Sequence, residues 1–269
     1  MMAGRRTLSY IAFGVRFELT ADSEALLAKM QQRTPWSTEV CDDRLGEAGR
    51  FSVASAGEAY CLSASEEVLA EGAELEPILD RLGRELMVHV AEHSPERVFV
   101  HAGVVGWHGH ALVLPGASFA GKTTLVAALV RAGATYYSDE YAVIDENGRV
   151  HPYARELQMR EAGGIMQRAV AIEEIDGCMG AGPRPVSHVV FAQYAKGAVW
   201  QPEPVSPGMA ALETMRHAIP VRRSPGRVMA ALARMMEAAT ALRSMRGEAD
   251  ETAAALVAAM SNSACEAAR

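Results

Sequence analysis

The chain has no apolar run long enough to cross a membrane. A transmembrane helix needs about 18 consecutive apolar residues, and no window of the 269-residue sequence approaches that length. The N-terminus, MMAGRRTLSY, also lacks the apolar core of a secretory signal. These absences predict a soluble, cytoplasmic protein with no membrane partner.

Paired cysteines and an excess of basic residues are missing as well. The four cysteines are far apart with no C-x-x-C pair, so neither a zinc site nor a disulfide framework is indicated: Cys41, Cys61, Cys178 and Cys265. Lys and Arg number 26 against 33 Asp and Glu, which gives a formal net charge of -7 at pH 7. An acidic surface disfavours general binding to nucleic acid.

One stretch, residues 112 to 124 (LVLPGASFAGKTT), fits the phosphate-binding loop pattern G-x-x-x-x-G-K-[ST]. Glycines let the loop turn so that its N–H groups face a phosphate, Lys122 reaches the terminal phosphates, and Thr123 offers a hydroxyl to Mg²⁺. An apolar run precedes the loop and an apolar helical pattern follows it. The expected nucleotide contacts are Gly116, Ala117, Ser118, Phe119, Ala120, Gly121, Lys122, Thr123 and Thr124.

The pattern divides the chain into a small N-terminal α/β domain with a linking helix, residues 1–93, and a catalytic α/β domain, residues 94–269. In the first we expect a strand over 13–19, a helix capped by Thr20 or Asp22, and short strands at 51–53 and 60–62. A helix over 74–93 carries one apolar face and ends at Ser94-Pro95.

In the second domain, strands over 98–105 and 111–114 pair as a hairpin that leads into the loop. Further expected elements are a strand over 136–144, a turn at 145–148, loops around a short helix over 154–183, a strand over 187–194, a helix over 206–217, an apolar segment over 228–244 that faces the core, and an alanine-rich C-terminal helix.

Two adjacent acids, Asp139 and Glu140, fall in the middle of the expected strand over 136–144. Mg²⁺ bound between phosphates needs a carboxylate nearby, so at least one of them is a candidate for metal binding or proton transfer. They point in opposite directions unless the strand ends there. The alternative is a pair of solvated acids.

Other candidates have weaker patterns. His101 lies in an apolar strand, where a histidine is more often a satisfied core residue than a functional one. Arg222, Arg223 and Arg227 surround Ser224-Pro225-Gly226, and such a cluster suits phosphate recognition or an ordinary solvated surface equally well.

Four motifs in order, VHAGVV, PGASFAGKT, RAGATYYSDE and IPVRRSPGR, resemble the HPr kinase/phosphorylase catalytic domain and its smaller phosphoenolpyruvate carboxykinase-like relatives, over roughly residues 98 to 245. The short N-terminal part is similar to that of lasso-peptide precursor kinases. The resemblance implies a P-loop kinase core that uses ATP and Mg²⁺ on a protein or peptide substrate with an acceptor serine. It also implies that HPr itself is not the substrate and that the chain can form a homo-oligomer.

Carried over residue by residue, the resemblance makes His101 the active-site histidine and Lys122 the phosphate contact. Thr123 and Asp139 become the metal contacts, and Glu140 the base on the acceptor serine. Arg222 and Arg227 match the arginines of the family's P-V-R-P-G-R segment and become phosphate or substrate contacts.

Three side chains depart from the family pattern, and two of them, Phe119 and Gln158, motivate an alternative function. Phe119 stands where the family usually has glycine, Glu140 replaces an aspartate, and Gln158 stands where the family has a glutamate. The four motifs and the residues carried over from the family still make an ATP-dependent serine kinase the leading hypothesis. The alternatives are a catalytically inactive nucleotide-binding regulatory or scaffold module of the same fold, and a small-molecule kinase or ATPase.

Overall fold

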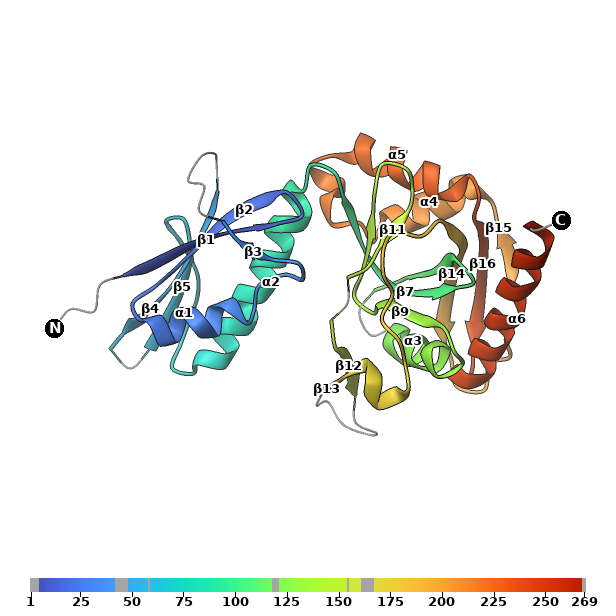
Figure 1. Cartoon of the computed structure of the whole chain (residues 1–269), viewed down its shortest axis with the longest axis horizontal. Coiled ribbons are helices and arrows are strands. Elements are labelled where there is room, and N and C mark those ends of the chain that lie inside the picture. Colours follow the sequence, from blue (N-terminus) through green and yellow to red (C-terminus); the bar gives the residue numbers. More distant parts are fainter. Residues whose placement is uncertain are drawn as a thin grey trace. The chain divides into compact units, whose positions relative to one another are not determined.

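The computed structural model describes residues 5–41, 48–57, 59–117, 121–153, 155–160 and 167–267. The chain folds into two compact units, Met1–Glu96 and Arg97–Arg269, each with its own sheet (Figure 1). Both units mix helices with strands, so the fold is α/β. No helix in the described ranges is both long and apolar enough for a membrane span.

The first unit is a six-stranded sheet, in the order β3-β1-β2-β4-β5-β6, with two helices packed against it. All neighbouring strands are antiparallel except β2 and β4. Its elements are β1 (Arg6–Ala12), β2 (Val15–Ala21), α1 (Glu24–Gln31), β3 (Glu39–Val40), β4 (Gly49–Ala56), β5 (Ala59–Ala64), β6 (Glu67–Gly72) and α2 (Leu75–His93).

The helices of this unit are confirmed, with one correction to a cap. The apolar face of α1 is buried, but its N-cap is Ser23, whose hydroxyl accepts a hydrogen bond from the Leu26 N–H at 3.2 Å. The strand expected over 13–19 is partly wrong, because Phe13 and Gly14 have positive φ and form the turn between β1 and β2. Helix α2 ends at Ser94, as predicted.

The second unit has one main sheet, in the order β11-β10-β7-β8-β14-β16-β15, with β9 also paired to β7. Strands β8, β14 and β16 run parallel to one another. The sheet strands are β7 (Val98–Trp107), β8 (His110–Pro115), β9 (Thr135–Ser138), β10 (Tyr141–Ile144), β11 (Val150–His151), β14 (Val186–Tyr194), β15 (Glu203–Val205) and β16 (Thr240–Arg246).

Apolar helices cover both faces of this sheet. One core contains α4 (Pro207–Met215) and α5 (Pro225–Met236), and the other contains α3 (Lys122–Arg131) and α6 (Ala249–Ala267) (Figure 1). The remaining elements are β12 (Leu157–Arg160), β13 (Gln167–Val170) and the short 3-10 helices η1 (Ile172–Ile175) and η2 (Ile219–Arg222). A helix–sheet–helix arrangement leaves the strand ends and their loops as the exposed edges of the unit.

The β7–β8 hairpin, strand β14, helix α4 and the C-terminal helix confirm the predictions for those segments. The short helix expected within 154–183 is present as the 3-10 helix η1, but the β12–β13 strand pair in the same segment was not predicted. The segment after Pro225 breaks at Glu237, and its second half is the strand β16, inserted between β14 and β15. Apolar spacing continues across the break, and so the spacing alone does not reveal it.

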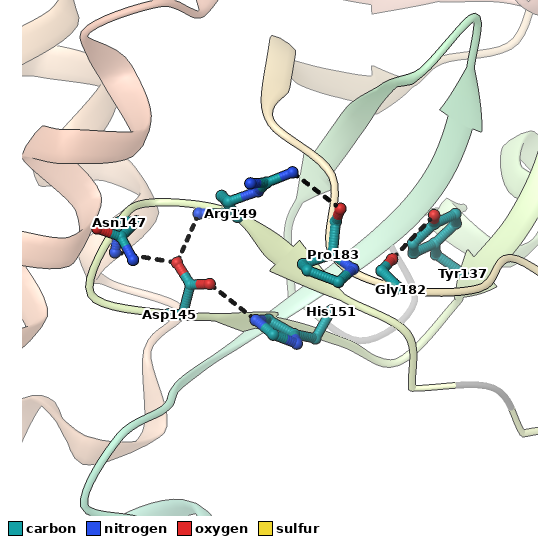
Figure 2. Close-up of polar contacts among 7 residues, drawn as sticks. All are labelled: Tyr137, Asp145, Asn147, Arg149, His151, Gly182 and Pro183. Atoms are coloured by element: carbon teal, nitrogen blue, oxygen red, sulfur yellow. Dashed lines mark hydrogen bonds and ion pairs between the residues drawn. The ribbon is translucent and has the colours of Figure 1, made fainter.

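The predicted turn at Asp145–Gly148 is present and is held by the Asp145 carboxylate (Figure 2). This group accepts the backbone N–H of Asn147 and of Arg149, both at 2.9 Å, and contacts the His151 ring at 2.8 Å. Arg149 then donates to the Pro183 carbonyl, and Tyr137 donates to the Gly182 carbonyl. These hydrogen bonds fix the turn and the segment at Gly182-Pro183 to the sheet. They give the Asp145 carboxylate and the Arg149 and Tyr137 side chains a structural role.

Candidate functional site

The candidate site lies where the parallel strands β8, β14 and β16 end. Their last residues are Pro115, Tyr194 and Arg246, and the carboxyl ends of parallel strands share one edge of a sheet. Open α/β sheets bind ligands at this edge. The glycine-rich loop connects β8 to α3 here, so the sequence motif is placed at the edge where ligand binding is expected.

The loop is tied to the sheet and to its own lysine. The Gly116 N–H donates to the His101 carbonyl on β7 at 3.2 Å. The Lys122 ammonium donates to the carbonyls of Gly116 at 2.8 Å and Ala117 at 2.7 Å, so it lies against the loop. Ser118, Phe119 and Ala120 lie outside the described residues, and the predicted contacts there have no structural account.

Gly121 ends the loop in a conformation that favours glycine. Its φ of 81° is left-handed, and a Cβ at this position would lie 2.5 Å from Arg246 Nη2. The Arg246 guanidinium donates to the Gly121 carbonyl at 2.8 Å from β16. The second glycine of the motif is thus required by backbone conformation and by a close neighbour.

The first turn of α3 meets the acid pair. The Thr123 hydroxyl donates to Asp139 Oδ2 at 3.2 Å, and the Tyr136 hydroxyl lies 3.1 Å from Asp139 Oδ1 and 2.8 Å from the Arg155 carbonyl. Thr124, the next residue of the helix, is exposed. The hydroxyl and the carboxylate predicted to hold a metal ion are therefore adjacent.

The strand expected over 136–144 is wrong: it is two strands, β9 and β10, separated by Asp139 and Glu140. The buried Ser138 hydroxyl accepts the backbone N–H of Glu140 at 3.1 Å and of Tyr141 at 2.9 Å, which turns the chain at the acids. Ala102 of β7 pairs with Pro115 on one side, and its N–H donates to the Glu140 carbonyl on the other. The loop and the acids therefore flank the same residue of β7.

The two acids have different surroundings. Burial raises the pKa of Asp139, and its hydrogen bonds with Tyr136, Thr123 and Gln158 oppose that rise. Glu140 leaves 44% of its side chain exposed and lies 3.8 Å from the Arg155 guanidinium. Desolvation by the surrounding protein still raises the Glu140 pKa, against the lowering effect of Arg155. Asp139 is thus held by donors, while Glu140 is the accessible carboxylate.

His101 of β7 is half-buried and pairs with Tyr141 of β10, the residue after the acid pair. Its ring packs against Tyr141 with the centroids 4.7 Å apart, and its backbone N–H donates to the backbone carbonyl of His217 at 2.9 Å. Burial lowers the His101 pKa, and the charges of Lys122 and His217 lower it further. The histidine is therefore next to the lysine and favours its neutral form.

The two predicted arginines lie on neighbouring elements. Arg222 is exposed at the end of η2, which begins just after the His217–Ala218 contact with β7. Arg227 is half-buried in the first turn of α5. The structure brings the η2 segment beside β7.

The residues present fit a magnesium ion at Asp139. Oxygen ligands suit Mg²⁺, and here a carboxylate and a hydroxyl meet beside a helix N-terminus. Within the described ranges no Lys or Arg forms an ion pair with Asp139. Burial disfavours the ionised carboxylate and so raises its pKa. A divalent cation would balance that charge. Described residues contain no group of three or more His, Cys, Asp or Glu that could hold a metal by itself.

Sequence reasoning missed four residues of this site: Tyr136, Arg155, His217 and Arg246. The apolar spacing around Arg246 suggested no charged partner for the loop, because its strand was not predicted. The tyrosines beside the acids were visible in the sequence, but nothing marked Tyr136 as the one that donates to Asp139.

A cavity of about 290 Å³ lies elsewhere, at the turn end of the β7–β8 hairpin. Its lining includes Trp107, His110, Tyr137 and Arg184. The loop and the acids lie at the other end of this hairpin, so the cavity is separate from the candidate site.

The sequence matches no protein-family model, and a search of curated proteins finds no match.

Proposed function

We propose that the protein is an ATP-dependent kinase that phosphorylates a serine of a protein or peptide, on a P-loop core of the HPr kinase and phosphoenolpyruvate carboxykinase-like type. The observation that carries the proposal is the contact between Thr123 and Asp139, 3.2 Å, directly behind a loop of sequence GASFAGKT. A phosphate loop needs such an acid for its metal ion.

The chain's own groups account for nucleotide binding. The N–H groups in the first turn of α3 lie at the helix N-terminus that follows the loop, where they would donate to a phosphate, and the helix dipole would add to the attraction. Lys122, held near two loop carbonyls, is the cation for the terminal phosphates. Thr123 and Asp139 would hold Mg²⁺, which neutralises charge on the β- and γ-phosphate oxygens when bound.

Glu140 is the proposed general base. Its carboxylate is accessible, whereas Asp139 is engaged by Thr123 and Tyr136. A pKa raised toward neutrality makes a carboxylate a better acceptor for the proton of an attacking hydroxyl. Arg155 keeps a positive charge beside it, which maintains the ionised form before the proton arrives. Proton transfer and metal binding are thus divided between the two acids.

His101, Arg222 and Arg227 have supporting roles in this proposal. A neutral His101 beside Lys122 lets the lysine keep its charge for phosphate. In this proposal the arginines on η2 and α5 would contact the substrate or its new phosphate group. Serine as the acceptor rests on the sequence resemblance, since the site geometry alone accepts any hydroxyl.

Phosphoryl transfer to a serine-peptide library tests the proposal. Wild type, Lys122→Ala and Glu140→Gln are incubated with labelled ATP and Mg²⁺, and ATP affinity is measured alongside. The expected result is transfer by the wild type only, with ATP affinity kept by Glu140→Gln and lost by Lys122→Ala. Binding without transfer to any peptide supports the inactive-module alternative. Turnover that needs no peptide supports a small-molecule kinase or ATPase.

A further inference from the structure

A tyrosine and a buried arginine flank the loop on the side away from the acids. The acids join β9 and β10, which pair with β7 on one side of β8. Tyr194 and Arg246 end β14 and β16, on the other side of β8. The loop that follows β8 therefore lies between the acid pair and the Tyr194–Arg246 pair.

Arg246 is fixed in place by the protein. It is 2% exposed, and its guanidinium donates to the carbonyls of Gly121 at 2.8 Å and Gly247 at 2.9 Å. The same guanidinium lies over the Tyr194 ring, 5.2 Å from the centroid. A guanidinium held this way covers one side of the ring and fixes its orientation.

Tyr194, in contrast, is open to solvent. The residue is 46% exposed, although it is the last residue of β14 in the central sheet. A Cβ on Gly121 would lie 3.6 Å from the Tyr194 Cβ, so the ring begins beside the last loop residue before Lys122. An oriented, exposed aromatic ring next to a phosphate loop is suited to stacking a flat ring of a ligand.

The order of groups along a nucleoside triphosphate decides which end of the ligand reaches this ring. The γ-phosphate must lie on the side of Asp139, the proposed Mg²⁺ ligand, and Glu140, the proposed general base. The β-phosphate lies over the loop, and the nucleoside then extends away from the acids. That direction leads over the ends of β14 and β16.

We propose that Tyr194, backed by Arg246, is the stacking surface for the purine base of the nucleotide. The inference rests on the proposed function, because it assumes that the loop binds a triphosphate. Stacking depends on the contact area between the rings and not on the hydrogen-bonding groups of the base, so ATP and GTP are expected to bind this surface with similar affinity.

Calorimetry with two probes tests the proposal: Mg·ATP, which carries a base, and Mg·tripolyphosphate, which does not. Tyr194→Ala is expected to weaken ATP binding by about tenfold, within the range for a lost base–aromatic stack. It leaves tripolyphosphate affinity unchanged, and Tyr194→Trp keeps ATP affinity. Met245→Ala is the matched control, because Met245 is 44% exposed and precedes Arg246 on the same strand; its ATP affinity stays at the wild-type value.

The outcomes separate this inference from the proposed function. Equal ATP affinity in wild type and a folded Tyr194→Ala overturns the inference and leaves nucleotide binding intact. Equal weakening of both probes also overturns it, since Tyr194 would then support the loop instead of the base. If the wild type binds neither probe, the proposed function fails and the inference with it.

Discussion

The Thr123 hydroxyl donates to the Asp139 carboxylate across 3.2 Å, which joins the first turn of α3 to the break between β9 and β10. The contact exists because Ser138 turns the chain at Asp139 and Glu140, and because β7 pairs with β8 on one side and with β10 on the other. The Ser138 turn and the pairing of β7 thus combine to place an oxygen pair at the end of the loop.

Asp139→Asn is predicted to abolish the magnesium-dependent part of ATP affinity while increasing stability at pH 8. Burial raises the Asp139 pKa in the folded protein, so the folded state favours the protonated acid. The wild-type contribution is favourable below the unfolded pKa of about 3.9 and is lost as pH rises through the raised folded pKa. Urea unfolding at pH 8 without Mg²⁺ checks the stability, and calorimetry with and without Mg²⁺ checks the affinity. Lower stability of the variant at pH 8 would contradict this account of the carboxylate.

Tyr136→Phe is predicted to lower the free energy of unfolding by about 1–3 kcal/mol, because buried acceptors lose a hydroxyl donor. The variant also weakens Mg·ATP binding, since Asp139 loses one of the groups that hold it. Denaturant unfolding and calorimetry measure the two effects.

Tyr137→Phe is the control for this substitution. Tyr137 is equally buried and also hydrogen-bonded, but its partners are Gly182 and Arg184 instead of the acid pair. Both variants lose stability, and only Tyr136→Phe changes Mg·ATP affinity. Equal effects of the two substitutions on nucleotide binding would show that Tyr136 acts through the fold alone.

Gly121→Ala is predicted to destabilise the protein by roughly 1–3 kcal/mol, since a left-handed φ and the nearby Arg246 both oppose a side chain. Gly208→Ala is the control, because a Cβ there meets no atom within 4 Å and the position is helical. That substitution leaves stability equal or slightly raised. Thermal unfolding of both variants provides the comparison, and a Gly121→Ala protein as stable as Gly208→Ala would contradict the strain argument.

His188 is predicted to make stability fall as pH decreases below about 6.5. It is 3% exposed on β14, and burial lowers its pKa, with the charge of His110 lowering it further. The unfolded chain therefore binds more protons than the folded one below the unfolded pKa, which favours unfolding as pH falls through that range. His188→Gln removes this contribution, so its unfolding free energy drops less than that of the wild type between pH 7.5 and 5.5. An identical drop in both proteins would rule out this role for His188.

Much of the fold follows from local patterns in the sequence. The apolar faces of α2 and α3 and the hairpin of β7 and β8 have the expected periodicity, and the glycine-rich loop falls between its strand and helix as predicted. These features depend on residues close together in the chain, where side-chain spacing reports burial directly.

The sequence-based predictions fail where a contact between distant residues, or a single side chain, determines the secondary structure. Residues 136–144 have the composition of one strand, but the Ser138 hydroxyl accepts two backbone N–H groups and turns the chain between β9 and β10. The strand β16 exists because it pairs with β14 and β15, and its apolar residues also suit a helix. Arg246 reaches the loop only through that pairing, so its contact with Gly121 has no signal in the local sequence.

Calorimetry of Mg·ATP binding by wild type and Lys122→Ala tests whether the loop before α3 is a nucleotide site. Lys29→Ala is the control, as it removes an exposed lysine of the first unit. We expect micromolar binding by the wild type and by Lys29→Ala, and none by a folded Lys122→Ala. Equal affinity in all three proteins, or no binding by the wild type, would contradict a nucleotide site at this loop.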